Sequence, residues 1–400
     1  MTTGAARPIR LVAGFFTVGL WTLGSRVLGF VRDILIAAFM GAGPAAEAFL
    51  VAFALPNMFR RFFAEGAFNT AFIPLFAKKL EAGEDPVGFA RQAASGLGGV
   101  LIVLTLLAQL VMPWLVLAMA SGFADDARLG LATGYGRIVF PYILFISLAA
   151  LLSGVLNASG RFAAAAAAPI VLNVILIAAL ILAERSASDH GLWLAWGAAV
   201  AGLAQLALVW TAALRAGFRI APVRPYLSPD MRRLLVIAGP AMLAGGVMQI
   251  NLLVGRQVAS FFDGAIVWLS LADRLYQLPL GVVGAAIGVV LLPELSRRLS
   301  AGDQEGGRDA LSRAGELALA LTVPAAAALM VIPLPLASVM FERGDFTAAD
   351  SAATALALAV YGAGLPAFVL QKVLQPLYFA REDTKTPFRY ALVAMVINAV

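Results

Sequence analysis

The residues most able to do chemistry in this sequence are cations that interrupt long apolar segments. There are eight of them: Arg26, Arg32, Arg60, Arg61, Arg137, Arg256, Arg274 and Lys372. On insertion scales each costs at least about 2.5 kcal/mol at the centre of a bilayer, so each should face water, a partner or a cargo. A guanidinium stays charged in a dry cavity and binds two phosphate oxygens at once. The set therefore predicts a site for an anion, with a pyrophosphate as the simplest matching group.

The spacing of these arginines around two turns predicts that several of them share one chamber. Arg26 and Arg60 flank a turn near Ala42. In antiparallel helices both would lie roughly 24 to 27 Å below that turn. Arg32 would lie about 9 Å closer to the turn than Arg26, and about 120° around the helix from it. Two more arginines flank an equivalent later turn at Gly264: Arg256 and Arg274.

Some of these cations also have simpler structural interpretations. Glu65 follows Arg61 by four residues, which is the spacing of an ion pair on one helix. Arg60 is placed to extend its side chain toward the membrane surface. Arg32 is placed to neutralise the adjacent Asp33. Both interpretations, ligand binding and structural pairing, stay open for these residues.

Other kinds of chemistry find little support in the residue types. The chain has no cysteine and one histidine, His190, so neither a metal cluster nor a nucleophilic triad can be assembled. Asp125 and Asp126 are the nearest candidates for a metal-dependent glycosyl- or phosphotransferase, and their surroundings are typical of a solvated loop. We therefore predict a protein that is not an enzyme and that uses no metal and no cofactor.

The composition places most of the chain in lipid. Its 400 residues are 61% hydrophobic and 13% charged, whereas soluble domains carry about 25% charged residues. The net charge of +6 comes from basic residues scattered between apolar segments, which argues against a nucleic-acid partner. A helix crosses the hydrocarbon with about 20 apolar residues. We predict an all-α integral membrane protein with eleven visible spans, the last without a stop before Val400: 9–39, 44–77, 92–119, 129–157, 165–183, 192–214, 233–262, 265–296, 314–340, 350–379 and 387 onward.

Lysine and arginine counts in alternate loops predict the orientation of these spans. Eighteen fall on one side: Arg7, Arg10, Lys78, Lys79, Arg91, Arg161, Arg215, Arg219, Arg224, Arg232, Arg233, Arg297, Arg298, Arg308, Arg313, Arg381, Lys385 and Arg389. Three fall on the other: Arg128, Arg185 and Arg343. Because cytoplasmic loops carry the excess of basic residues, the N-terminus is predicted to be cytoplasmic.

An internal repeat predicts two lobes around a central cavity. Three features of the first hairpin are the turn at 38–40, Pro56 and the exit sequence at 74–80. They recur about 220 residues later as the turn at 260–262, Pro279 and the exit sequence at 293–299. Six spans separate the copies, so the lobes should be related by an axis along the membrane normal. We place them at 1–220 (helices 1–6) and 221–400 (helices 7–11, apparently truncated); chance similarity of two apolar hairpins is the alternative.

Several long charged segments resemble the MurJ (also called MviN) family of lipid II flippases, within the multidrug/oligosaccharidyl-lipid/polysaccharide exporter superfamily. The matching segments are residues 25–33 (SRVLGFVRD), 55–68 (LPNMFRRFFAEGAF), 140–144 (FPYIL) and 272–275 (ADRL), with Pro279 and Gly281. The resemblance covers essentially the whole chain.

This resemblance implies a function as well as a fold. The family has fourteen helices in two pseudo-symmetric six-helix lobes. It carries undecaprenyl-pyrophosphate-linked disaccharide-pentapeptide, the peptidoglycan precursor for cell wall synthesis, from the inner to the outer leaflet of the bacterial cytoplasmic membrane by alternating access. The partners implied are lipid II, membrane lipids and a coupling ion. Sodium, protons and the membrane potential all stay open as energy sources.

The resemblance also implies the residues that bind the cargo. The family's cavity residues correspond to Ser25, Arg26, Arg32, Arg60 and Arg274. Glu47 stands where the family has an aspartate in its second helix, which keeps the charge on a longer side chain. The alternative function is export of another lipid-linked oligosaccharide, or of drugs, on the same fold.

Overall fold

The chain folds into helices, as its sequence predicts. The computed structural model describes residues 11–60, 67–286 and 303–380, with short helical stretches at 297–298 and after 385. Each named element in these ranges is an α-helix or a 3-10 turn. Six described segments are long and apolar enough to cross a membrane: Pro86–Met119, Ala127–Ala158, Ala163–Arg185, His190–Arg215, Glu305–Val331 and Ala348–Gln375. The prediction of an all-α membrane protein is confirmed.

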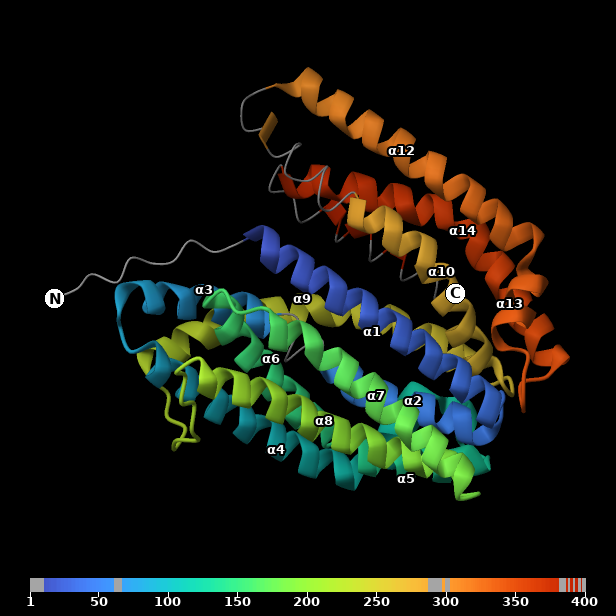
Figure 1. The fold of residues 1–400 in the computed structure, drawn as a ribbon, viewed down its shortest axis with the longest axis horizontal. Coiled ribbons are helices and arrows are strands. Elements are labelled where there is room, and N and C mark those ends of the chain that lie inside the picture. The colour runs from blue at the N-terminus through green and yellow to red at the C-terminus, as the bar shows by residue number, and fades with distance from the viewer. Residues whose placement is uncertain are drawn as a thin grey trace. The chain divides into compact units, whose positions relative to one another are not determined.

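The helices group into two compact units. The first unit comprises Met1–Phe39 and Pro44–Phe261, and the second comprises Met40–Gly43 and Phe262–Val400. The first unit contains α1 (Leu11–Met40), α2 (Pro44–Arg60), α3 (Ala67–Ala82), α4 (Pro86–Met119), η2 (Ser121–Phe123), α5 (Ala127–Val139), α6 (Tyr142–Ala158), α7 (Ala163–Arg185), α8 (His190–Arg215) and α9 (Pro229–Ala259). The second contains α10 (Ala265–Ala286), α12 (Gln304–Val331), α13 (Pro333–Phe341) and α14 (Ala348–Ala380) (Figure 1).

Several predicted spans differ from the helices in their boundaries. The predicted span 44–77 contains two helices, α2 and α3, and their connection at 61–66 lies outside the described residues. The span 129–157 divides at Pro141, where a proline cannot donate the helical hydrogen bond. The span 314–340 begins ten residues earlier, because the Asp303 side chain caps α12, and it divides at Ile332 before Pro333. The end of the span 265–296 and most of the last span lie outside the described residues.

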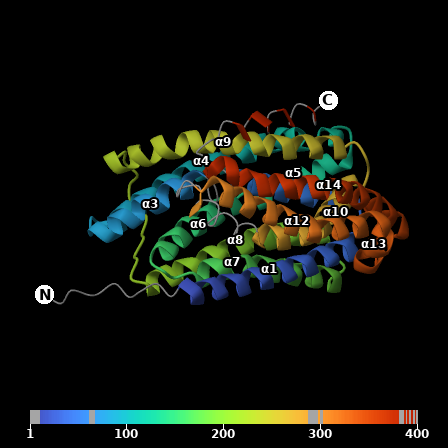
Figure 2. The same cartoon turned by 90° about the horizontal axis from the view of Figure 1, so that it is seen from above.

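The first unit is held together by close helix packing and by buried amide hydrogen bonds. Gly202 of α8 lies so close to Tyr142 that an added Cβ would stand 2.7 Å from the ring. Small residues of this kind let membrane helices approach each other. The Tyr142 hydroxyl donates to Gln205 Oε1 (3.1 Å), and Gln205 Nε2 donates to the Ala168 carbonyl (2.8 Å). These bonds connect α6, α8 and α7, which run side by side in both views (Figures 1 and 2).

Helix α9 packs with the first unit at both of its ends. Near its start, Asp230 pairs with Lys79 of α3 at 2.9 Å. Near its end, Gln257 Nε2 donates to the carbonyls of Leu117 (3.0 Å) and Ala118 (2.6 Å) at the end of α4. Compact packing and membership of a symmetric repeat are different properties, so the predicted lobe boundary at 220 stays a prediction.

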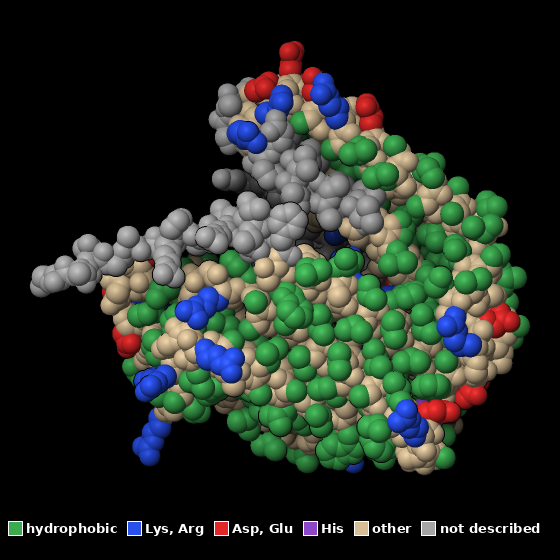
Figure 3. Space-filling view, viewed as in Figure 1, with side chains coloured by type: hydrophobic (Ala, Val, Ile, Leu, Met, Phe, Trp, Pro, Cys, Tyr) green, Lys and Arg blue, Asp and Glu red, His purple; other side chains and the backbone are tan. Residues whose placement is uncertain are grey.

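The outer surface of the first unit is suited to lipid. Large apolar side chains on α4 recur at helical spacing and are well exposed, including Leu106 (62%), Leu110 (72%) and Trp114 (67%). Figure 3 shows one face of the molecule on which hydrophobic side chains cover the middle of this unit, with lysine, arginine and acidic side chains toward the helix ends. This distribution matches an apolar band between two polar interfaces.

The second unit is organised around α14, which packs on α10, α12 and α13. At the start of α14, Asp350 accepts hydrogen bonds from the backbone N–H of Thr347 (2.9 Å) and from Trp268 Nε1 of α10 (2.9 Å). The carboxylate therefore caps α14 and joins it to α10.

The two turns of the predicted repeat share an unusual backbone conformation. Gly41 lies between α1 and α2 with φ +55°, and Gly264 lies between α9 and α10 with φ +82°. Only glycine adopts this region without strain. The local structure thus agrees with the repeat at the turn, whereas residues 293–296 and 299 of the second exit sequence lie outside the described residues.

Replacing Gly41 by alanine should destabilise the second unit. The new Cβ would lie 2.6 Å from the Asp345 carbonyl oxygen on a backbone with positive φ. We therefore expect the free energy of unfolding to fall by about 1 to 3 kcal/mol. Thermal unfolding of the detergent-solubilised protein measures it. The matched control is Gly130→Ala in α5, where a Cβ meets nothing within 4 Å. Equal unfolding midpoints for the two variants would show that the turn at Gly41 accepts a side chain without strain.

Candidate binding site

A polar cluster joins α1 to α7 inside the first unit. Asn173 of α7 donates from Nδ2 to the Ser25 carbonyl (3.0 Å) and to the Ser25 hydroxyl (3.4 Å). Its Oδ1 accepts a hydrogen bond from Arg32 Nη1 at 3.0 Å. The close approach is possible because Gly29, between these positions on α1, has no side chain and faces the Asn173 amide. Asn173, which was not predicted, therefore brings together two of the predicted site residues, Ser25 and Arg32.

Arg32 is neutralised in part by its neighbour. Its Nε and Nη2 both donate to Asp33 Oδ1, at 3.0 and 2.7 Å. The two side chains are only 14% and 11% exposed. A guanidinium has five N–H donors, and these bonds with the one to Asn173 use three. Structural pairing of Arg32 with Asp33, left open by the sequence, is confirmed, and two donors remain for another acceptor.

Arg26 differs from Arg32 in its surroundings. Its side chain is exposed, next to Ser25 on α1, and it forms no ion pair with the residues that the structure describes. An exposed guanidinium about 14 residues from the end of α1 lies deep in any membrane that this helix crosses. Because lipid tails do not solvate it, it requires water or an anionic ligand.

Glu47 lies in a second polar cluster, at the start of α2. Its carboxylate is 1% exposed and accepts from Arg128 Nη1 at 2.7 Å. Arg128 Nε also donates to Asp126, and its guanidinium lies 4.5 Å from the centre of the Phe123 ring. The backbone N–H of Arg128, together with its guanidinium, holds the pKa of Asp126 below its usual value of 3.8. Contact of Glu47 with a cargo would require this ion pair to open.

The remaining predicted site residues lie elsewhere in the fold. Arg60 is the last residue of α2 and is partly buried, and Arg61 lies outside the described residues. Arg274 is on α10 in the second unit, beside Asp273. Among the other cations within spans, Arg137 is exposed on α5, and Lys372 Nζ lies 5.5 Å from the centre of the Phe368 ring on α14.

Two residues that organise these polar clusters were missed by the sequence interpretation. Asn173 is the single polar residue in the apolar run 170–183, and an isolated amide in such a run is a signal for a buried hydrogen-bond partner. Arg128 was counted as a loop residue, but it lies in the first turn of α5 and is 5% exposed. Its partner Glu47 is 81 residues away in sequence, so no local pattern indicates the pair.

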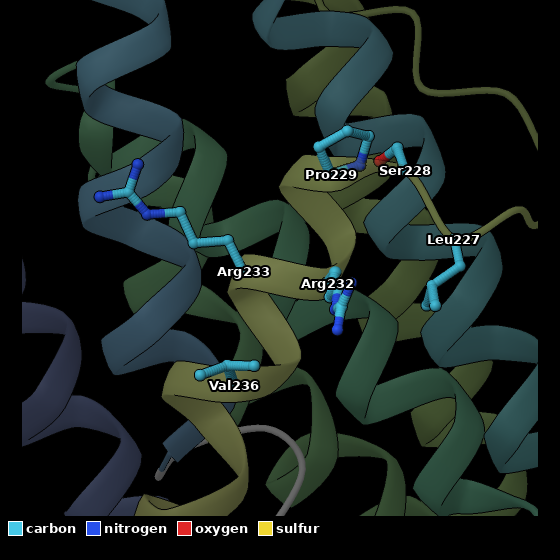
Figure 4. Close-up of a pocket in the computed structure, with 6 residues that line it drawn as sticks. All are labelled: Leu227, Ser228, Pro229, Arg232, Arg233 and Val236. Carbon is cyan, nitrogen blue, oxygen red and sulfur yellow. The ribbon is translucent and has the colours of Figure 1, made fainter.

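A separate basic pocket opens on the surface where α9 begins. It is lined by Leu227, Ser228, Pro229, Arg232, Arg233 and Val236 (Figure 4). Both arginines are exposed, and their side chains point in different directions from the helix. Both lie in the first turns of α9, in the basic segment that the sequence predicts to be cytoplasmic. Among the described residues, no group of three or more histidine, cysteine or acidic side chains is arranged to hold a metal ion.

Comparison with known proteins gives a consistent result along the chain. The family model described as "Lipid II flippase MurJ" matches residues 36–400. The probable lipid II flippase MurJ of Rhizobium meliloti (strain 1021) is 49% identical over 395 residues, which cover 97% of this chain and 74% of that protein. The lipid II flippase MurJ of Burkholderia cenocepacia is 37% identical over 399 residues, covering 98% and 77%.

Solved structures show the same relationship. A structure titled "Lipid II flippase MurJ, inward closed conformation" is similar with a TM-score of 0.82 at 26% identity, covering 96% of this chain and 79% of that one. An inward-facing multidrug resistance transporter of the MATE family is similar with a TM-score of 0.70 at 14% identity, covering 93% and 84%. The second likeness shows a shared fold alone.

The buried ion pair gives a test of how Glu47 acts. Replacing only Arg128 by methionine should destabilise the first unit by about 3 to 5 kcal/mol, because the Glu47 carboxylate would stay buried without its partner. Replacing both, with Glu47→Leu and Arg128→Met, should recover part of that loss. Thermal unfolding checks both, with the exposed Arg185→Met as the matched control. If the stability loss of the double variant equals the sum of the losses of the two single variants, the two side chains do not stabilise each other.

Proposed function

We propose that this chain, which belongs to the lipid II flippase MurJ family, moves lipid II from the inner to the outer leaflet of the bacterial inner membrane. The observation that carries this proposal is the family match over residues 36–400. Relatives of that name align over nearly the whole chain. The helices that suit a bilayer support the same location.

The cargo explains why such a fold holds cations. Lipid II carries a pyrophosphate, two sugars and a peptide on one lipid tail, and moving those groups through hydrocarbon unaided is costly. A path between helices replaces the lost water with fixed polar groups. We assign pyrophosphate binding to the arginines that the family resemblance implies, Arg26, Arg32, Arg60 and Arg274, because bidentate guanidinium binding suits phosphate oxygens.

The cluster on α1 supports a role for Arg32 in exchanging ligands. With no cargo, Asp33 and Asn173 hold its guanidinium and lower the cost of the charge. A pyrophosphate can then take the two remaining donors or replace the carboxylate. Ser25 is held by the same Asn173, so we assign it to orienting the cluster and to contacting the cargo. Glu47 enters the site only when its bond to Arg128 opens.

Alternating access is the mechanism that we propose for the movement. The family resemblance implies two lobes that rock about one bound cargo, and the repeat of the first hairpin about 220 residues later supports two such lobes. An exporter of cationic drugs on this fold would need a cavity rich in carboxylates, whereas eight cations interrupt the apolar segments here. An exporter of another lipid-linked oligosaccharide would share the pyrophosphate site. Competition between lipid II and such an oligosaccharide for binding to the chain separates the two functions.

Replacing Arg26 and Arg274 together by alanine should abolish growth when the variant is the only copy in the cell. Each lost charge-assisted bond should weaken pyrophosphate binding about 10- to 100-fold. Arg26→Lys should also impair growth, because an ammonium cannot bind two oxygens in the bidentate geometry. The matched control is Arg185→Ala, an exposed arginine at the end of α7. Normal growth of the double variant at wild-type protein levels would count strongly against the proposed site.

We also propose that the N-terminus is cytoplasmic, from the excess of basic residues in alternate loops. The chain has no cysteine, so single cysteines report orientation without background. Asp125→Cys should react with a membrane-impermeant maleimide in intact cells, whereas Glu84→Cys should react only after permeabilisation. Both positions are exposed. The opposite labelling pattern would invert the proposed orientation.

A further inference from the structure

Helices α10 and α14 of the second unit share a face that combines aromatic and polar side chains. They pack side by side (Figures 1 and 2). The side chains of this face, here called the aromatic–acidic face, are Asp273, Tyr276, Gln277, Tyr361, Phe368 and Lys372. Arg274, which we assign to the pyrophosphate, follows Asp273 directly.

Three aromatic rings form a continuous row on this face. The Tyr276 ring centre lies 5.6 Å from that of Tyr361, with the ring planes at 53°. It lies 6.3 Å from that of Phe368, at 66°. Tyr276 and Tyr361 are partly buried, and Phe368 is 37% exposed. The row is thus partly accessible, most of all at Phe368.

Polar groups lie beside this row. Gln277 Nε2 donates to Asp273 Oδ2 at 2.5 Å, and both side chains are exposed. Lys372 lies at the other end of the row, over Phe368.

Lipid tails are a poor environment for such a face. Asp273 is exposed near the middle of α10, and a carboxylate at mid-membrane costs about 2.5 kcal/mol or more on insertion scales. The neighbouring helix α14 is among those long and apolar enough to cross a membrane. A face of this kind requires water or a polar ligand. The carboxylate repels phosphate, so the ligand group that contacts it is neutral and rich in hydroxyls, or cationic.

We infer that the aromatic–acidic face binds the sugars of the lipid-linked cargo, an inference that rests on the proposed function. The C–H groups on one side of a pyranose ring carry partial positive charge and stack on the negative face of an aromatic ring. Sugar hydroxyls donate to a carboxylate and exchange hydrogen bonds with an amide, which Asp273 and Gln277 supply.

The position of Arg274 supports this assignment over a peptide site. The first sugar is joined directly to the pyrophosphate, so its binding site must adjoin the phosphate site. Arg274 and Asp273 are adjacent on α10, about 1.5 Å apart along the axis and about 100° apart around it. One helix therefore carries the proposed phosphate ligand and the proposed sugar ligand at adjacent positions.

Three lipid probes separate the parts of the cargo in a binding test on the purified full chain. They are undecaprenyl pyrophosphate, the same lipid with the disaccharide but no peptide, and complete lipid II. Phe368→Leu removes a ring and keeps apolar bulk. Trp196→Ala is the matched control, since Trp196 is an aromatic on α8 that is 58% exposed.

Phe368→Leu should weaken the binding of both sugar-bearing probes roughly three- to tenfold and leave the binding of undecaprenyl pyrophosphate unchanged. Asp273→Asn should also weaken the binding of the sugar-bearing probes. It should not weaken the binding of undecaprenyl pyrophosphate, because the substitution removes a charge that repels phosphate. Trp196→Ala should bind all three probes as the wild type does. Thermal unfolding of each variant verifies that it is folded.

Three results would overturn the inference. An equal loss of affinity for all three probes would indicate a general effect on the site. Unchanged affinity of Phe368→Leu or of Asp273→Asn for the sugar-bearing probes would show that the sugars do not bind this face. A loss confined to complete lipid II would assign the face to the peptide. Failure of the pyrophosphate site is seen separately, as unchanged binding of undecaprenyl pyrophosphate to Arg274→Ala.

Discussion

A charge that leaves water for the interior of a helical membrane protein must find an opposite charge, a polar partner or a ligand, because hydrocarbon solvates it poorly. The cations of this chain meet that requirement to different degrees. Arg128 is buried and bonded to two carboxylates. Arg32 is held by one carboxylate and one amide. Arg26 is exposed without an ion pair in the described part of the chain. This gradation separates structural charges from those that are available to a ligand.

The same constraint accounts for the polar residues that are not charged. Asn173 and Gln205 each lie in an apolar helix, and each uses its amide to join helices: Asn173 joins α7 to α1, and Gln205 joins α8 to α6 and α7. Isolated amides in apolar runs are therefore the points at which the first unit is fixed together. Because Asn173 also holds Ser25 and Arg32, the bonds that stabilise the packing of α1 on α7 orient the proposed site as well.

Much of the fold follows from the apolar pattern, because the bilayer demands long apolar helices. Boundaries were less predictable where a helix continues beyond the lipid, as α12 does from Gln304. Hydropathy detects only the part of a helix that lies in hydrocarbon. One expected span divides at Pro141. A proline inside an apolar run can end a helix or only kink it, and because the outcome depends on neighbouring packing, the sequence does not predict the division.

The candidate site was predictable in its residue types and less so in its contacts. Arginines within apolar segments, and the resemblance of residues 25–33 to a known family, identify Ser25, Arg26 and Arg32. The bond from Arg32 to Asn173 joins residues 141 apart, and that from Arg128 to Glu47 joins residues 81 apart. Contacts of this kind depend on how helices pack, which one sequence does not specify. The binding roles of all six predicted residues stay predictions: Ser25, Arg26, Arg32, Glu47, Arg60 and Arg274.

Depleting the protein in growing cells tests most directly whether this chain carries a lipid-linked pyrophosphate across the membrane. The quantity to measure is the fraction of lipid-linked peptidoglycan precursor that reacts with a membrane-impermeant reagent. If the chain is the flippase, the total precursor rises after depletion while the reactive outer-leaflet fraction falls. An unchanged outer-leaflet fraction after depletion, with no other flippase in the cell, would contradict that role.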